Sequence, residues 1–201
     1  MNELLLVLDF GGQYKELIAR KVRELSVYSE IKPGNLSADE IKRLNPIGII
    51  LTGGPDSVYL PDAPKCDPNL WKLGIPILGI CYGMHMMCHM LGGKVASGGT
   101  GEYGRVDVSL AAQQPSELFR GIKGDFPALM SHRDAVTRLP KGFCATASTS
   151  VCVSACEHVG RKLYGVQFHP ETKHTDGGRE IIRNFLYAVC GASGDYNRRG
   201  N

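Results

Sequence analysis

Apolar residues in the first half of the chain occur in short continuous runs, which are typical of strands buried on both faces of a sheet. They predict strands at residues 4–9, 27–32, 48–51 and 75–80. Helical patterns separate these runs: one over residues 14–25, one opened by the capping box Ser37-Ala-Asp-Glu40 and ending near Leu44, and one begun by Asp67-Pro68. Strands that alternate with helices need crossover connections, so this half predicts a doubly wound, mostly parallel α/β sheet.

The pattern changes at Glu102 to short alternating stretches with Gly and Pro turns between them, at residues 106–110, 129–130 and 143–147. This change predicts a β-rich extension. A strand over residues 162–168 follows, and then a last helix, with apolar residues from Ile181 to Val189, that stops at Gly191. Residues 192–201 contain no core-forming residues and predict a linker or disordered tail. We therefore expect one domain over residues 1–191.

Length and composition fit a single globular domain, because 201 residues with 43% hydrophobic content can build a sizeable core. The net charge of +3 comes from 23 basic and 20 acidic residues that are interspersed, and only Arg20-Lys21 and Arg198-Arg199 are locally basic, so nucleic acid binding is not indicated. No apolar run approaches the roughly 18–20 residues that span a bilayer. Seven cysteines without a C-x-x-C pair, and no secretory leader before the first strand, predict a reducing cytoplasm.

The fourth apolar run ends in Gly79-Ile-Cys81-Tyr-Gly83 and passes directly into a helical pattern. Flanking glycines allow a strand-to-helix turn so tight that its central residue is held in a strained backbone conformation, with its side chain directed toward solvent. The positive end of the helix then favours a thiolate. We interpret Cys81 as a nucleophile; the alternative, from local sequence alone, is a small core cysteine after a buried strand.

A cysteine nucleophile needs a base, and the base needs an orienting carboxylate. His169 and Glu171 are two residues apart at the end of a predicted strand, so their side chains should leave the same face, and Pro170 stiffens the link. We predict His169 as general base and then acid, with Glu171 stabilising the imidazolium. Taken alone, His-Pro-Glu also fits a strand-ending turn with a surface carboxylate; its combination with the elbow around Cys81 favours the triad.

Acyl transfer also needs backbone N–H groups directed at the developing oxyanion. We predict the Gly54 N–H, in the loop Thr52-Gly-Gly-Pro55, and the Tyr82 N–H, at the start of the elbow helix, as these donors. A glycine turn chosen only for its backbone freedom is the alternative. The loop and Cys81 both follow strands of the parallel half, so they should meet at the carboxyl edge of the sheet.

Other patterns predict no further chemistry. His85 and His89 stand four residues apart, but no third ligand has suitable spacing and the Glu of an H-E-x-x-H motif is absent, so we predict no metal. The methionines at 84, 86, 87 and 90 fit adaptable core filler. Gly11-Gly12 lacks both the G-x-G-x-x-G spacing and a P-loop lysine, so no nucleotide cofactor is predicted.

Six motifs, in order along the chain, resemble those of the class I (triad) glutamine amidotransferases, and in particular the glutaminase portion of GMP synthetases. They are Leu8-Asp9-Phe-Gly-Gly-Gln-Tyr14, Thr52-Gly-Gly-Pro55, Gly79-Ile-Cys81-Tyr-Gly-Met84, Glu102-Tyr-Gly104, Met130-Ser-His132 and Gly165-Val-Gln-Phe-His169-Pro-Glu171. The resemblance covers the chain from Leu4 to about Gly191. It implies a flavodoxin-like class I amidotransferase fold and cofactor-free hydrolysis of L-glutamine to glutamate and ammonia through a γ-glutamyl thioester on Cys81.

The resemblance also implies a set of substrate contacts. His85 stands where the family usually has a Gln that contacts the substrate, and residues 131–134 resemble the family's clamp for the α-amino and α-carboxylate groups. Arg133 stands where the family usually has a small residue, and its guanidinium would either contact the carboxylate or crowd the pocket. The expected substrate-binding residues are His85, Ser131, His132, Arg133 and Asp134.

A partner is implied as well. In the two-domain enzymes, an ATP-pyrophosphatase domain that holds ATP and Mg²⁺ and aminates XMP to GMP follows the glutaminase domain. The present chain ends before any serine-glycine-rich nucleotide loop, so we expect a separate glutaminase subunit or an excised domain, and the linker-like tail favours excision. Two alternatives stay open: a glutamine-binding or interaction module impaired by His85 and Arg133, and a γ-glutamyl peptidase or an amidotransferase of another pathway.

Overall fold

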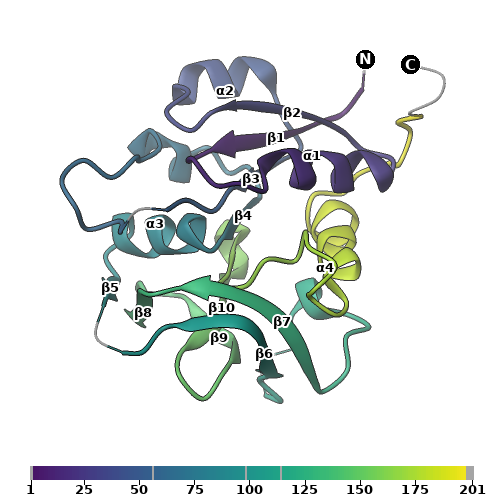
Figure 1. Cartoon of the computed structure of the whole chain (residues 1–201). Helices are drawn as coiled ribbons and strands as arrows, with labels where there is room; N and C mark the ends of the chain where they lie inside the picture. The colour runs from purple at the N-terminus through teal and green to yellow at the C-terminus, as the bar shows by residue number, and fades with distance from the viewer. Residues whose placement is uncertain (1, 56, 98, 114, 198–201) are drawn as a thin grey trace.

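A nine-stranded sheet runs through the molecule in the computed structural model, which describes residues 2–55, 57–97, 99–113 and 115–197 (Figure 1). The strand order is β2-β1-β3-β4-β11-β10-β9-β6-β7, and β5 and β8 form a separate antiparallel pair. The strands are β1 Leu4–Asp9, β2 Tyr28–Pro33, β3 Gly48–Leu51, β4 Ile77–Ile80, β5 Lys94–Ala96, β6 Glu102–Leu110, β7 Asp125–His132, β8 Ala135–Arg138, β9 Cys144–Ser148, β10 Val153–His158 and β11 Leu163–Val166.

The first five strands of that order are parallel, which confirms the doubly wound sheet expected from the apolar runs. Strands β3, β4 and β11 are buried along their whole length, as strands covered on both faces must be. Because the strands are parallel, their carboxyl ends lie at one edge, where the loops after β1, β3, β4 and β11 meet. The candidate catalytic residues come from these loops.

Helices cover both faces of the sheet, and each face has its own hydrophobic core. The helical segments are α1 Lys15–Glu24, α2 Ala38–Leu44, η1 Pro68–Lys72, α3 Tyr82–Met90, η2 Glu117–Phe119, η3 Val159–Arg161, α4 Gly178–Asn184 and η4 Phe185–Val189. Apolar residues of α1, α4 and η4 pack in one cluster, and those of α2, η1 and α3 pack in the other. The capping box is confirmed, because the Ser37 Oγ accepts a hydrogen bond from the Glu40 N–H at 3.2 Å.

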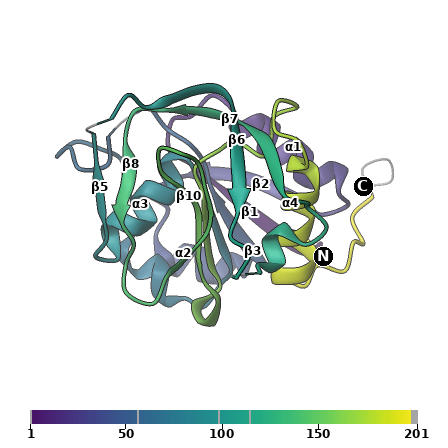
Figure 2. The same cartoon turned by 90° about the horizontal axis from the view of Figure 1, so that it is seen from below.

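The predicted β-rich extension is confirmed, and it continues the main sheet rather than forming a sheet of its own. Strand β10 pairs antiparallel with β11, and β9, β6 and β7 follow, each antiparallel to its neighbour. Seen from below, β6, β7 and β10 lie in front of the parallel strands β1 to β3 (Figure 2). The predicted strand over 162–168 is shorter, because the ladder of β11 ends at Val166.

Residues 192–197 have no regular secondary structure but are bonded to the start of the chain. The Ser193 N–H donates to Glu3 Oε1 at 2.8 Å, the Tyr196 N–H donates to the Ser26 carbonyl at 3.2 Å, and the Tyr196 ring packs against Tyr28. Residues 198–201, which include the basic pair Arg198-Arg199, lie outside the described residues. The domain boundary at Gly191 stays a prediction. In the described part of the chain, no helix combines the length and apolar character that a membrane crossing requires.

Candidate active site

The turn between β4 and α3 holds Cys81 in a conformation that few residues adopt. Cys81 has φ 54° and ψ −108°, and it is one of four described residues other than glycine with a positive φ. A Cβ on Gly79 would lie 2.7 Å from the Gly83 carbonyl carbon and oxygen, and a Cβ on Gly83 would lie 2.6 Å from the Leu51 carbonyl oxygen. The close approach of strand and helix therefore requires glycine at both positions, as the elbow motif predicts.

The Cys81 side chain is less accessible than the sequence analysis expected. We predicted that the elbow directs it toward solvent, whereas only 6% of the residue is exposed. The reason is that Cys81 lines a cavity of about 500 Å³, to which the loops after β1 and β3 and the end of β7 also contribute. A thiol in this position is reached by a small molecule that enters the cavity and is shielded from bulk water.

The loop after β3 lies directly against the elbow. The Thr52 Oγ1 fixes this loop, because it accepts the Phe10 N–H at 2.9 Å and donates to the Gly53 carbonyl at 3.0 Å. A Cβ on Gly53 would lie 3.2 Å from His169 Cε1, and a Cβ on Gly54 would lie 2.7 Å from the Phe10 carbonyl oxygen. Glycine at 53 thus lets the main chain approach the imidazole closely, and glycine at 54 lets it approach Phe10 and the Tyr82 ring. Gly54 and Tyr82 both line the cavity.

His169 and Glu171 form a buried ion pair beside Cys81. The His169 Nδ1 lies 2.9 Å from the Glu171 Oε2, and the side chains are 8% and 0% exposed. Burial by itself lowers the pKa of His169, but the neighbouring Cys81 thiol and the Glu171 carboxylate outweigh it and raise this pKa to about 10. His169 is therefore protonated at neutral pH, and an imidazolium in this position stabilises a thiolate on the adjacent sulfur.

The strand geometry that we assigned to His169 and Glu171 is wrong, although the two side chains do meet. Strand β11 ends three residues before His169, and both residues lie in the following turn. Pro170 has no N–H with which to continue a ladder. Instead, the His169 carbonyl accepts the Thr175 hydroxyl at 2.7 Å, and the His169 N–H donates to the Leu129 carbonyl at 3.1 Å. These bonds hold the imidazole over the thiol without strand pairing.

The five expected substrate-binding residues all line the same cavity: His85, Ser131, His132, Arg133 and Asp134. Ser131 and Arg133 are exposed at its mouth, whereas the other three are buried, with His85 4%, His132 5% and Asp134 6% exposed. The Asp134 Oδ1 accepts the Tyr59 hydroxyl at 3.3 Å. The cavity lining thus combines a guanidinium, a carboxylate and a hydroxyl with the thiol and the imidazole.

Gln167 contacts the thiol, and the sequence analysis gave it no role. Its Nε2 donates to Cys81 Sγ at 3.6 Å, and its Oε1 lies 2.7 Å from the His85 Nε2. Burial lowers the pKa of His85 to about 4, so its ring is neutral and its Nε2–H donates to the amide oxygen. The sequence signal that could have found it is a glutamine within an apolar run, between Val166 and Phe168, because a polar group buried there needs partners. In the structure, Gln167 is fully buried.

Comparison with known proteins shows which family has this fold and these motifs. The model of the family "Glutamine amidotransferase class-I" matches residues 6–189. The chain belongs to the class I glutamine amidotransferases. Among curated relatives, the "GMP synthase [glutamine-hydrolyzing]" of Acetivibrio thermocellus is 56% identical over 97% of this chain, and that of Streptococcus thermophilus is 50% identical over 96%. These alignments span only 38% and 37% of the relatives' own length.

Two solved structures agree with the fold. The crystal structure of a candidate GMP synthase subunit from Thermoplasma acidophilum has a TM-score of 0.82 at 29% identity, and covers 94% of each chain. A glutamine amidotransferase from Thermotoga maritima has a TM-score of 0.73 at 17% identity, and covers 96% of this chain and 100% of its own. The second likeness shows the fold alone. Together they confirm the class I amidotransferase architecture, with its mainly parallel sheet and antiparallel extension.

Proposed function

We propose that this chain hydrolyses L-glutamine to glutamate and ammonia, and that the ammonia serves an ATP-pyrophosphatase domain or subunit that aminates XMP to GMP. One observation carries the proposal: Cys81, held at positive φ, lies beside the His169–Glu171 pair and lines a cavity that also contains charged groups for an amino acid. Membership of the family and the names of the relatives support the same activity. A cytoplasmic location belongs to this proposal and rests on that relationship.

The residues act in two steps, acylation of Cys81 and hydrolysis of the resulting thioester. The Cys81 thiolate attacks the side-chain amide carbonyl of glutamine and forms a C–S bond, while the Gly54 and Tyr82 N–H groups bind the oxyanion. The C–N bond then breaks, and the His169 imidazolium gives its proton to the leaving nitrogen, which departs as ammonia. Neutral His169 next takes a proton from water, the hydroxide breaks the thioester, and glutamate leaves with the thiolate restored. Glu171 stabilises the imidazolium throughout.

Substrate selection follows from the charged and polar residues 131–134 that line the cavity. The exposed guanidinium of Arg133 is suited to bind the α-carboxylate in a bidentate manner, and the carboxylate of Asp134 is suited to bind the α-ammonium group. Ser131 offers a hydroxyl beside them. In this proposal, His85 does not take over the substrate contact that the family's usual Gln makes at this position. It orients the Gln167 side chain, which in turn donates to the Cys81 sulfur.

The test is a steady-state assay of glutamate and ammonia release by the chain alone and with the synthetase portion, ATP, Mg²⁺ and XMP. We expect slow release that Cys81→Ala abolishes, a higher rate with the complete mixture, and stoichiometric GMP. Glutamate release without GMP would assign the chain to another amidotransferase pathway or to γ-glutamyl peptidase chemistry. Saturable glutamine binding without any release would leave only a binding module.

A further inference from the structure

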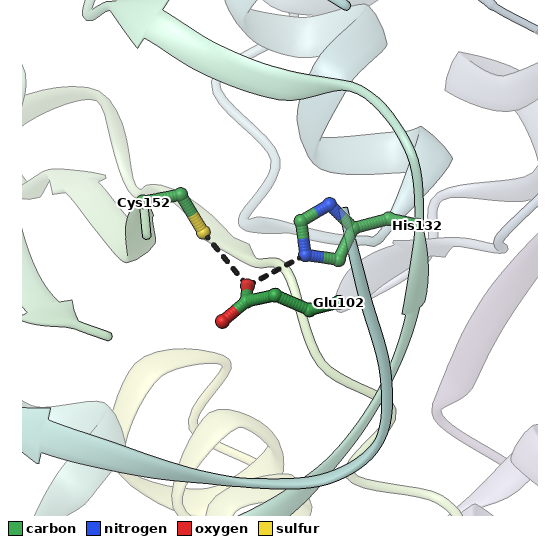
Figure 3. Close-up of side chains that lie close together, drawn as sticks. All are labelled: Glu102, His132 and Cys152. Atoms are coloured by element: carbon green, nitrogen blue, oxygen red, sulfur yellow. Dashed lines mark hydrogen bonds and ion pairs between the residues drawn. The ribbon is translucent and has the colours of Figure 1, made fainter. Parts of the chain in front are cut away.

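A second group of reactive side chains lies next to the cavity, at the end of the β6–β7 hairpin. Glu102 and His132 are directly paired across the two strands, and Cys152 lies in the turn before β10. The His132 Nε2 lies 2.8 Å from Glu102 Oε1, and the Cys152 Sγ lies 3.2 Å from the same oxygen (Figure 3). Among the residues that the structure describes, this is the one place where three such ligand atoms come together, all within 4.8 Å of one another.

Two details distinguish this cluster from a satisfied hydrogen-bond network. Glu102 Oε1 takes both contacts, whereas Glu102 Oε2 is buried and has no hydrogen-bond partner among the described atoms. A buried carboxylate oxygen without a partner is unfavourable and uncommon, and this one is open to a ligand on the cluster. In addition, the His132 Nδ1 lies 2.6 Å from the Asp134 carbonyl oxygen, which accepts its N–H, so a metal ion at Nε2 would replace the proton that Nε2 shares with Glu102 Oε1. The Nδ1 contact is the arrangement that orients histidines at metal sites.

We propose that Glu102, His132 and Cys152 bind a divalent transition-metal ion, and that Zn²⁺ is the ion that fits best. A sulfur, a nitrogen and an oxygen donor suit a borderline-soft ion, whereas Mg²⁺ and Ca²⁺ prefer oxygen alone. Zinc bond lengths place tetrahedral ligand atoms about 3.3–3.8 Å apart, so the carboxylate oxygen has to move outward by roughly half an ångström. Three protein ligands leave the fourth position to water.

Charge balance supports a dication. When the metal–sulfur bond forms, the Cys152 thiol loses its proton to solvent. The thiolate and the carboxylate then neutralise the two charges of the ion, and no electron is transferred. Of the three ligands only His132 also lines the glutamine cavity, so the site is distinct from the catalytic thiol.

Zinc titration against a chromophoric chelator tests the proposal. The background variant is Cys81→Ala, which removes the other thiol–imidazole pair from the measurement. We expect one Zn²⁺ per chain, and replacement of Zn²⁺ by Co²⁺ should produce a thiolate-to-cobalt charge-transfer band in the near ultraviolet. Adding Cys152→Ser should abolish the band and weaken zinc binding by more than the roughly 10–100-fold that loss of an outer-shell partner causes.

Two further variants make the outcome decisive. Cys144, another half-buried free cysteine, lies on β9, and Cys144→Ser should leave zinc affinity unchanged. Glu102→Gln keeps the size and an acceptor oxygen but removes the charge, and it should weaken binding while far-ultraviolet circular dichroism stays that of the parent. Absence of zinc binding by the folded parent, or unchanged affinity in Cys152→Ser, would overturn the proposal. Neither result bears on glutamine hydrolysis, which the assay above tests separately.

Discussion

Gly83→Ala should destabilise the protein even though alanine is the better helix former. The added Cβ would lie 2.6 Å from the Leu51 carbonyl oxygen and 2.8 Å from the Leu51 Cβ, against about 3.5–4.0 Å for an ordinary contact. Leu51 belongs to β3, which is buried between β1 and β4 and cannot move away. Overpacking of this kind costs about 1–3 kcal/mol, and contacts this short with the main chain and Cβ of a buried strand place the cost in the upper part of that range, at about 2–3 kcal/mol. Helix propensity returns about 1 kcal/mol. We expect a net loss of about 1–2 kcal/mol.

Thermal unfolding measures this loss directly. For a domain of this size, 1 kcal/mol corresponds to about 2–4 °C, so Gly83→Ala should lower the Tm by about 2–8 °C. Gly99→Ala is the matched control, because no described atom lies within 4 Å of its added Cβ, and its Tm should change by less than about 2 °C. The clash also pushes α3 from the sheet, so glutamine hydrolysis should fall. A Gly83→Ala variant as stable as Gly99→Ala would refute the close packing of the elbow.

Three other predictions concern the triad and its support. Glu171→Gln removes the charge that holds the imidazolium, so turnover should fall by about 10²–10⁴-fold with a much smaller change in KM, as steady-state glutamate release can measure. Because the pKa of His169 is raised to about 10 in the folded state, its protonation stabilises the fold fully below about pH 6.5, and this stabilisation is lost as the pH rises through about 10. The difference in unfolding free energy between wild type and His169→Gln should therefore shrink over that pH range. A difference that stays constant with pH would contradict this assignment. Gln167→Leu removes a donor to the sulfur, so alkylation of Cys81 should slow by roughly 10–100-fold, whereas His85→Gln, which can still contact the amide, should change the rate less.

Much of the fold followed from local patterns, because they were consistent with one another. Continuous apolar runs separated by helical spacing predicted the parallel half, and each predicted strand there overlaps an observed one. The extension was harder. Strands β5 and β8 are short and partly exposed, and residues 94–96 pair with the distant residues 135–138, so no local period announces them. Strand β10 pairs with its sequence neighbours β9 and β11, but Ser154 and Glu157 are buried in it, so its polar residues do not mark an exposed face.

The candidate site shows the same division. The elbow was readable because Gly79 and Gly83 have a steric reason that local sequence expresses. The turn that carries His169 was not, since its bonds to Leu129 and Thr175 come from other segments. The Glu102–Cys152 contact joins residues 50 positions apart. Local sequence spacing cannot predict contacts between residues so far apart, because only folding brings the two residues together.

The identity of the nucleophile is the claim on which the function depends. An electrophilic glutamine analogue, followed by intact mass and peptide mapping, tests it among seven cysteines. We predict one adduct per chain on Cys81, protection by excess glutamine, and no adduct in Cys81→Ala. Adducts spread over the other cysteines, or labelling that glutamine does not slow, would contradict the account.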